Sequence, residues 1–360
     1  MSGCFLQMIA PEDRPLIDEW RKTVAGLWHW FNFQFQGGPM PEVMHAFALD
    51  VTRRCREVDA KIPGFANEFM RRLGSLCGRE KYEPHYEQLL QQLAELVVIR
   101  QVTTFSWPAG TTFEYEPPSS TSKKNPELVV RCPDFRLGIE VKCPALLEHL
   151  RLRAANSQQM TARLPIRDTL AGLSNTGQVT LPRDNPLKDF LVSAQAKFEG
   201  HKATDPDFYS VLIVVWDDFI YEPIAALRNS ASGLLTPNSF FKKDGVPVTF
   251  PALDGVVLIR HLHLLQMATR DENMANGQWS AFDYGSPNED PFKALIAMPD
   301  APRALPEEAI ECLQAVPIEQ LIGAEYQPLD TVMWIKTRDP KWNEPLAEKP
   351  TLPEGEGPPV

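Results

Sequence analysis

The stretch VVRCPDFRLGIEVKCP, residues 129–144, decides the fold and the chemistry expected of this chain. Its apolar and β-branched residues predict two β-strands with a tight reversal near residues 136–138. Because successive side chains of a strand point to opposite faces, Glu140 and Lys142 share one face, and the apolar residues beside them form the other. The reversal is expected to bring Asp134 alongside Glu140 and Lys142.

Regular elements are predicted on both sides of this hairpin. Residues 83–100 have an apolar stripe at helical spacing, and residues 102–107 are rich in β-branched and aromatic residues, which predicts a helix followed by a strand. Downstream, Asn185 and Pro186 open a helix as a capping residue followed by proline, and residues 209–216 predict a buried strand. The order of helix, strand, hairpin, helix and strand predicts a compact α/β unit.

Three regions follow from the sequence pattern. Residues 1–80 are mainly helical, residues 81–270 hold the α/β unit with a polar insertion at about 150–185, and residues 271–360 are Pro-rich. The chain has 33 prolines in 360 residues, nearly double the average share of about 5%, and many lie late in the sequence. We therefore expect irregular structure after residue 270 and a flexible tail at the C-terminus.

Two carboxylates and a lysine on one hairpin suit the metal-assisted hydrolysis of a phosphodiester. Carboxylate oxygens are hard ligands that favour Mg²⁺ or Mn²⁺. A bound divalent ion polarises the scissile phosphate and lowers the pKa of a coordinated water molecule. Lys142 would orient or deprotonate that water and offset the charge that builds up on phosphorus.

The hairpin resembles the PD-(D/E)xK nuclease superfamily, whose restriction-endonuclease-like core has the element order αβββαβ. The resemblance rests on Pro133 and Asp134, followed by Glu140, Val141 and Lys142. It implies that Asp134 and Glu140 hold the metal ion, that the main-chain carbonyl of Val141 completes the metal site, and that Lys142 is the catalytic lysine. The implied cofactor is Mg²⁺, with Mn²⁺ as a substitute.

The resemblance also implies two contributions from helices. Many members of the superfamily add a glutamate from the helix before the first strand, for which Glu83, Glu87 and Glu95 are candidates and Glu87 is favoured. Some members place a Gln-x-Lys motif on the helix after the hairpin, which corresponds to Gln195 and Lys197. All these expectations concern roughly residues 83–220, and the flanking regions have no counterpart in the resemblance.

Charge and hydropathy limit the classes of partner. The chain has 36 basic and 47 acidic residues, a net charge of −11, which excludes a protein that coats nucleic acid in general. DNA is then expected to bind through a local basic channel, an oligomer or a second protein subunit. The longest apolar run, residues 211–216, is far shorter than the roughly 20 residues that cross a membrane, and no secretory signal is recognised. We therefore expect a cytoplasmic protein without a membrane partner.

The sequence predicts a Mg²⁺-dependent DNA endonuclease or exonuclease, and restriction, anti-phage defence and DNA repair remain open as its setting. One alternative is a catalytically silent binding or scaffold subunit that keeps the nuclease fold. Another is a protein that binds a basic partner through its acidic surface. Four arginines of the insertion are either phosphate contacts or part of a solvated basic loop: Arg151, Arg153, Arg163 and Arg167.

Overall fold

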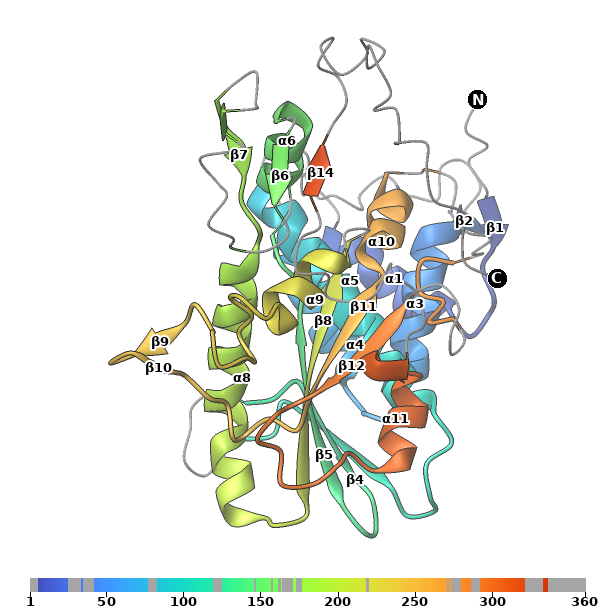
Figure 1. The fold of residues 1–360 in the computed structure, drawn as a ribbon. Helices are drawn as coiled ribbons and strands as arrows, with labels where there is room; N and C mark the ends of the chain where they lie inside the picture. The colour runs from blue at the N-terminus through green and yellow to red at the C-terminus, as the bar shows by residue number, and fades with distance from the viewer. Residues whose placement is uncertain are drawn as a thin grey trace, which may run out of the picture.

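A seven-stranded mixed sheet forms the centre of the protein, seen here in a computed structural model (Figure 1). In spatial order the strands are β13 (Val316–Pro317), β12 (Lys293–Ala297), β11 (Gly255–Arg260), β8 (Phe208–Trp216), β5 (Arg136–Lys142), β4 (Leu128–Arg131) and β3 (Thr112–Tyr115). β5, β8 and β11 are parallel, whereas β3, β4 and β5 form an antiparallel meander. The structure describes residues 6–24, 34, 42–76, 83–118, 125–145, 147–156, 158–160, 163, 171–172, 177–217, 220–270, 272, 280–285, 292–320 and 333–335.

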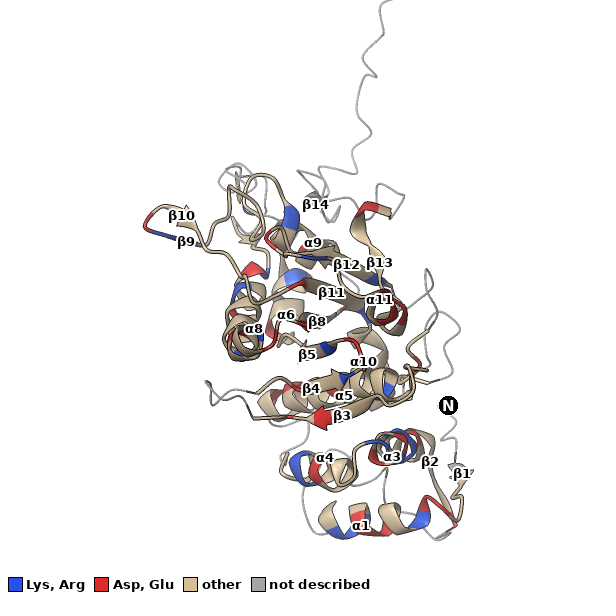
Figure 2. Ribbon diagram, turned by 90° about the horizontal axis from the view of Figure 1, so that it is seen from below, with Lys and Arg blue, Asp and Glu red and all other residues tan. Residues whose placement is uncertain are grey.

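Helices cover both faces of this sheet. One face carries α8 (Asp184–Thr204) and α9 (Tyr221–Arg228), and the other carries α5 (Glu83–Thr104), α10 (Leu262–Thr269) and α11 (Glu307–Leu313). A further layer lies beyond α5 and consists of α1 (Arg14–Val24), α3 (Ala46–Asp59) and α4 (Phe65–Gly74) (Figure 2). β1 (Leu6–Met8) pairs with β2 (Val43–His45) in that layer. The chain is thus an α/β protein, as predicted.

The reversal between β4 and β5 lies earlier in the sequence than predicted. The turn spans residues 132–135 and is closed by a hydrogen bond of 2.9 Å from the amide of Cys132 to the carbonyl of Phe135. Pro133 has no amide hydrogen to offer a ladder and has a fixed φ, and the Asp134 after it is a residue that favours turns. The Pro-Asp pair is therefore the turn itself and not the end of a strand.

The strand predicted at residues 102–107 does not form, because α5 continues to Thr104. Val102 and Thr103 are buried, so the apolar surface of the helix extends into this segment. The hydroxyl of Thr103 donates to the carbonyl of Ile99 at 2.8 Å, which accommodates a β-branched residue inside a helix. The first strand of the meander, β3, instead begins at Thr112, after the turn that contains Gly110.

β5 lies between two apolar layers and alternates as the sequence predicts. The side chains of Leu137, Ile139 and Val141 join the core on the α5 face. On the α8 face, Gly138 lies so close to Phe198 and Phe208 that an added Cβ would approach their rings to 2.8 and 2.5 Å. The alternation leaves positions 140 and 142 on this same α8 face.

The region after residue 270 is more regular than predicted. β12 pairs antiparallel with β11, and β13 pairs parallel with β12, so residues 293–297 and 316–317 extend the central sheet. The prediction of an irregular C-terminal region is therefore wrong for this segment. The predicted flexible tail lies within residues 336–360, outside the described residues.

The insertion between β5 and α8 has regular elements of its own. It contains α6 (Leu147–Ala155), β6 (Gln158–Met160) and β7 (Val179–Thr180), and β14 (Met333–Ile335) pairs with β6 to complete a small separate sheet. A short hairpin of β9 (Lys242–Lys243) and β10 (Val246–Pro247) projects beside α8 (Figure 1), and η2 (Ile318–Gln320) follows β13. Among the described helices, none has the length and apolar character needed to span a membrane.

Candidate active site

Three glutamates lie in one row across the antiparallel meander. Leu128 pairs with Ile139, so the preceding residue of β4, Glu127, lies opposite Glu140 of β5. On its other side, the carbonyl of Glu127 accepts a hydrogen bond of 3.0 Å from the amide of Glu116, the residue after β3. Cross-strand neighbours have Cβ atoms about 5 Å apart, so the sheet alone brings these three carboxylates together.

Glu140 is a fully buried carboxylate held by two lysines. Its side chain has no exposed surface. Lys142, two residues along β5, places its Nζ 2.5 Å from Oε1, and Lys197 of α8 places its Nζ 2.7 Å from the same oxygen. Burial of a carboxylate is costly unless it is paired, and the two ammonium groups supply that pairing.

Glu127 shares these two lysines. Its Oε1 lies 3.2 Å from the Nζ of Lys197 and 3.8 Å from the Nζ of Lys142. Glu127, just before β4, and Glu140 of β5 therefore converge on the same pair of ammonium groups. The result is a compact cluster of two carboxylates and two amines on the α8 face of the sheet.

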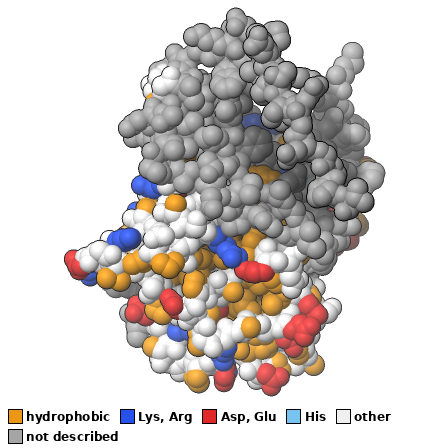
Figure 3. Space-filling model, in the orientation of Figure 1, with side chains coloured by type: hydrophobic (Ala, Val, Ile, Leu, Met, Phe, Trp, Pro, Cys, Tyr) orange, Lys and Arg blue, Asp and Glu red, His pale blue; other side chains and the backbone are white. Residues whose placement is uncertain are grey.

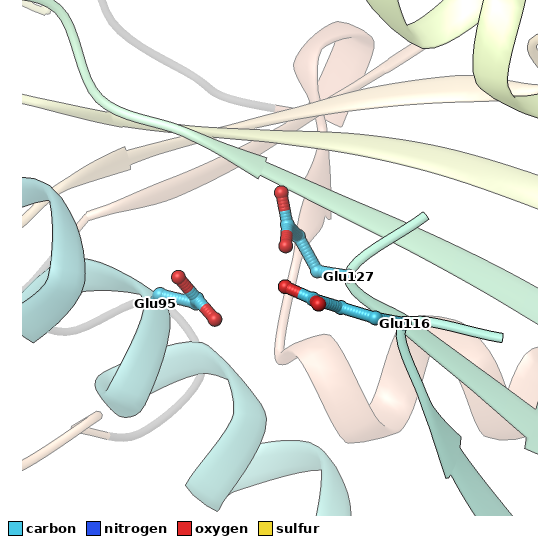
Figure 4. A group of neighbouring side chains, drawn as sticks. All are labelled: Glu95, Glu116 and Glu127. Carbon is cyan, nitrogen blue, oxygen red and sulfur yellow. The ribbon is translucent and has the colours of Figure 1, made fainter. Parts of the chain in front are cut away.

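Glu95 of α5 reaches the same cluster from the other side. One carboxylate oxygen each of Glu95, Glu116 and Glu127 lie within 4.8 Å of one another, and their side chains point toward a common space (Figure 4). The hydroxyl of Tyr115 donates to Glu95 at 2.7 Å, and Arg72 donates to it at 2.8 Å. Glu127 therefore belongs both to this group of three carboxylates and to the pair that shares Lys142 and Lys197 with Glu140.

The crowding of acids changes their proton affinity. Burial, together with the nearby Glu127 carboxylate, raises the pKa of Glu95 above its usual value. Burial, together with Glu127, also raises the pKa of Glu140, although Lys142 and Lys197 oppose that shift. Burial tends to lower the pKa of Lys197, but Glu140 and Glu127 outweigh it and raise that pKa. The site therefore places carboxylates and their paired cations in a desolvated environment.

Asp134 does not join Glu140, contrary to the prediction. It is exposed in the turn before Arg136, whereas Glu140 lies four residues further along β5. At about 3.3 Å per residue, that separation along the strand is about 13 Å. The cause is the position of the turn: a reversal centred within residues 132–135 places Glu127, and not Asp134, opposite Glu140.

Glu87 and Gln195 also lie away from the cluster. The carboxylate of Glu87 accepts a hydrogen bond of 3.0 Å from the amide of Leu147, the first residue of α6, and so caps that helix. Glu95 is eight residues further along α5, about 12 Å away along the helix axis. The side-chain oxygen of Gln195 accepts from the amide of Ala252 at 2.8 Å, because positions 195 and 197 of a helix face different directions.

Glu140, Lys142 and Lys197 are the predicted site residues that the structure brings together. The side chain of Val141 lies in the apolar core on the α5 face. The participation of its main-chain carbonyl in a metal site stays a prediction.

The insertion arginines that the structure describes are paired with carboxylates of the protein. Arg151 contacts Glu83, and Arg163 lies 2.5 Å from Asp184. Arg153 joins a buried network in which Arg183, Asp217, Glu222 and His149 also take part. These contacts tie the insertion to α5, α8 and α9. Arg167 lies outside the described residues.

The prediction missed Glu116 and Glu127, although the sequence contains a signal for Glu127. Pro126 and Glu127 stand directly before the apolar run of β4, so the acid begins a strand. If the Pro133-Asp134 pair is taken as a turn, the two strands pair in the register that sets Glu127 opposite Glu140. The contribution of Arg72 has no such local signal, because it depends on the packing of a separate helix.

The cluster offers carboxylate oxygens, the preferred ligands of Mg²⁺ and Mn²⁺, next to two lysine ammonium groups. This combination can hold a divalent cation and a phosphate group side by side. A comparison of the chain with models of protein families, with curated proteins and with solved structures found no match.

Proposed function

We propose that this protein is a metal-dependent nuclease that hydrolyses phosphodiester bonds of DNA. The observation that supports the proposal best is the convergence of Glu127, Glu140, Lys142 and Lys197 from β4, β5 and α8. The order α5, β3, β4, β5, α8, β8 is also the order expected of a restriction-endonuclease-like core. In this reading, Pro126 and Glu127 take the role that the sequence assigned to Pro133 and Asp134.

The chain's own residues fit a divalent cation. Glu95, Glu116 and Glu127 bring carboxylate oxygens within 4.8 Å of one another, and Glu140 lies on the far side of Glu127. Burial, with a smaller contribution from Glu127, raises the pKa of Glu95 and of Glu140, so ionisation of these carboxylates is unfavourable without a nearby cation. A divalent cation would favour their ionised forms. Glu127 and Glu140, with support from Glu95, are the residues proposed to hold it.

Each remaining residue then has a defined task. A bound Mg²⁺ would polarise the phosphate and make a coordinated water more acidic. Lys142, at the edge of the site, orients the attacking water and offsets the charge that develops on the phosphate. Lys197 holds the Glu127 and Glu140 carboxylates at a fixed separation, with its Nζ 3.2 and 2.7 Å from their oxygens. Tyr115 fixes the carboxylate of Glu95 through its hydroxyl group.

The charge distribution limits how the chain could bind DNA. On the face shown in Figure 3, the described basic side chains are scattered among acidic and apolar ones. With a net charge of −11, the chain depends on a few well-placed cations, on a second copy or on another subunit to bind a polyanion. Binding of DNA by a single chain is therefore expected to be weak, with a modest dependence on salt because few phosphates are neutralised.

The test is cleavage of supercoiled plasmid, linear duplex DNA and single-stranded RNA in the presence of Mg²⁺, Mn²⁺ or a chelator. We expect DNA cleavage that needs the metal ion. Glu127→Gln and Lys142→Met should each lower the rate by about 100-fold or more, because each removes a group that acts on the reacting phosphate or its cation. Asp134→Asn is the matched control, an exposed acid on the same hairpin that should leave the rate unchanged.

Two results would count against the proposal. Undiminished cleavage in both Glu127→Gln and Lys142→Met would show that this cluster is not the active site. A wild-type protein that cleaves no substrate but gains thermal stability with Mn²⁺, in a manner that depends on Glu127, would favour the silent binding subunit instead. In that case the ion pairs between Glu140 and the two lysines would be structural.

A further inference from the structure

Arg72 enters the site from outside the α/β unit. It lies near the end of α4, a helix of the layer beyond α5. Phe65, seven residues earlier and therefore on the same side of α4, packs edge-on against the ring of Tyr115 with centroids 5.1 Å apart. The Arg72 guanidinium lies over the same ring, 5.5 Å from its centroid. The two residues fix α4 against the end of β3.

The guanidinium of Arg72 connects two of the clustered carboxylates. Its Nη2 donates to Glu95 at 2.8 Å and to the hydroxyl of Tyr115, and its Nη1 donates to Glu116 at 3.5 Å. Glu95 and Glu116 each also bring an oxygen within 4.8 Å of one from Glu127. Arg72 therefore contacts the acidic cluster on the side opposite the lysines that hold Glu127 and Glu140.

Geometry explains why an arginine suits this position. The planar guanidinium has several donors in a fixed fork, so it can fix two carboxylates relative to one another. Glu95 is buried on α5, whereas Glu116 is exposed at the end of β3. Without a shared cation, two acids on separate elements would repel each other and turn apart. Arg72 keeps them directed at the space that Figure 4 shows between Glu95, Glu116 and Glu127.

We propose that Arg72 is a positioning residue for the metal-binding cluster, so that the N-terminal helical layer is a working part of the nuclease. The inference rests on the proposed function and deepens it. Arg72 does not need to touch the substrate or the cation. It acts through Glu95 and Glu116, which lie beside the proposed ligand Glu127. The loss of a residue that positions the surroundings of metal ligands typically costs about 10- to 100-fold in metal affinity or activity.

The experiment measures Mn²⁺ binding and Mn²⁺-dependent cleavage in the full-length protein. Calorimetric titration with MnCl₂ gives the Kd for wild type, Arg72→Met, Arg72→Lys and Arg71→Met. Arg71 is the matched control, since it is the neighbouring arginine of α4, is exposed and pairs with Glu68. We expect Arg72→Met to raise the Kd about 10- to 100-fold, Arg72→Lys to raise it less, and Arg71→Met to leave it unchanged.

The Mn²⁺ dependence of cleavage is a second measurement, and a purely structural role of Arg72 would leave it unchanged. In Arg72→Met, the Mn²⁺ concentration for half-maximal cleavage should rise with the Kd, and saturating Mn²⁺ should restore most of the rate. An unchanged Kd in Arg72→Met overturns the inference, and a tighter one overturns it too, because Arg72 would then be blocking the cluster. If Arg72→Met does not fold, an unchanged Kd in Arg72→Lys overturns the inference instead.

The same data separate this inference from the proposed function. A wild-type protein that neither binds Mn²⁺ nor cleaves DNA contradicts the proposed function before any variant is compared. A wild-type protein that does both, with Arg72→Met indistinguishable from it, contradicts only the role of Arg72.

Discussion

The buried carboxylate of Glu140 is paired with a lysine of its own strand and with a lysine of a separate helix. A carboxylate without exposed surface is tolerable in a folded protein only where charges pair with it, and here Lys142 and Lys197 do so. Lys142 comes from the same strand, but Lys197 comes from a helix 57 residues later in the sequence. The buried acid is therefore stable only when α8 has packed against β5, which couples the integrity of the site to the core.

Two of the three glutamates of α5 that the sequence offered as catalytic residues are expected to differ sharply in their effect on cleavage. Glu95→Gln should lower cleavage by about 10- to 100-fold, because Glu95 lies in the carboxylate cluster. Glu87→Ala should leave cleavage unchanged and lower the free energy of unfolding by about 1 kcal/mol, because it removes the cap on the Leu147 amide. Cleavage rates and urea unfolding of both variants measure this. The reverse pattern would restore Glu87 as the catalytic glutamate.

Residue identities were predictable where a local pattern determines them. Glu140 and Lys142 were found because strand alternation places them together, and Lys197 because it lies on the helix expected after the hairpin. Glu127 was missed because choosing between Pro126-Glu127 and Pro133-Asp134 requires the strand register, which a shift of the turn by a few residues changes completely.

At the scale of elements, β5 is the strand that positions the site. It pairs with β4 on one side and β8 on the other, and its glycine, Gly138, lets α8 and β8 approach closely through Phe198 and Phe208. Two residues further along the strand, on the same face, is Glu140. The close approach at Gly138 therefore sets how near Lys197 can come to the carboxylates.

We expect Gly138→Ala to disturb both stability and the site. The added Cβ would lie 2.5 Å from one ring and 2.8 Å from the other, so the strand or the helix must move, at a cost of about 1–3 kcal/mol. Displacement of α8 should also lower the cleavage rate. Gly172→Ala is the control, since its Cβ meets no atom within 4 Å. Thermal unfolding and cleavage assays of both variants test this, and a Gly138→Ala protein as stable as wild type would refute it.

Element prediction succeeded where periodicity is clear and failed where tertiary contacts decide. The span of β8 follows from an apolar run. The helix expected after Asn185 also forms, but α8 begins at Asp184 with Arg183 as its N-cap, so Asn185 lies inside the helix and is not its capping residue. The segment after Gln101 has the composition of a strand, yet it continues α5 because its side chains are buried against the core. Local propensity is a weak guide in such cases.

At the scale of the whole molecule, two groups of buried charge join the layers. The site joins α4, α5, β5 and α8, and a second network joins the insertion to α9 through Glu222. Arg183 and Arg153 lie 2.7 and 2.6 Å from the Glu222 carboxylate, which is almost fully buried. Despite that burial, hydrogen bonding from His149 and the charges of Arg183 and Arg153 lower the pKa of Glu222 to about 2.

Acidification should destabilise the protein in two successive ranges of pH. Burial lowers the pKa of His261 from 6.5 to about 4, so between these values the unfolded chain takes up a proton that the folded one refuses. The stability that His261 contributes is thus present above pH 6.5 and lost as the pH falls to about 4. Glu222, with a pKa lowered from 4.5 to about 2, loses its contribution below pH 4.5 in the same way. Each shift corresponds to about 3 kcal/mol.

Urea unfolding at pH 7.5, 5.5, 4.5 and 3 measures this dependence. His261→Gln should flatten the fall in stability above pH 4.5. Glu222→Gln should cost about 3 kcal/mol at pH 7.5, and its difference from wild type should shrink toward pH 3. If the free energy of unfolding of wild type and both variants changes with pH in the same way, His261 and Glu222 are not the groups that cause the pH dependence.

The order of strands in the sheet has a consequence for how the chain can be divided. β11 is an apolar, buried strand whose outer neighbour, β12, comes from residues beyond 290. A fragment that stops at residue 270, where the region predicted to hold the α/β unit ends, would lack β12. It would expose a long row of unpaired amide and carbonyl groups along β11. Such an edge is a template for pairing between copies, and the fragment would be prone to aggregate although it contains every carboxylate and amine of the proposed site.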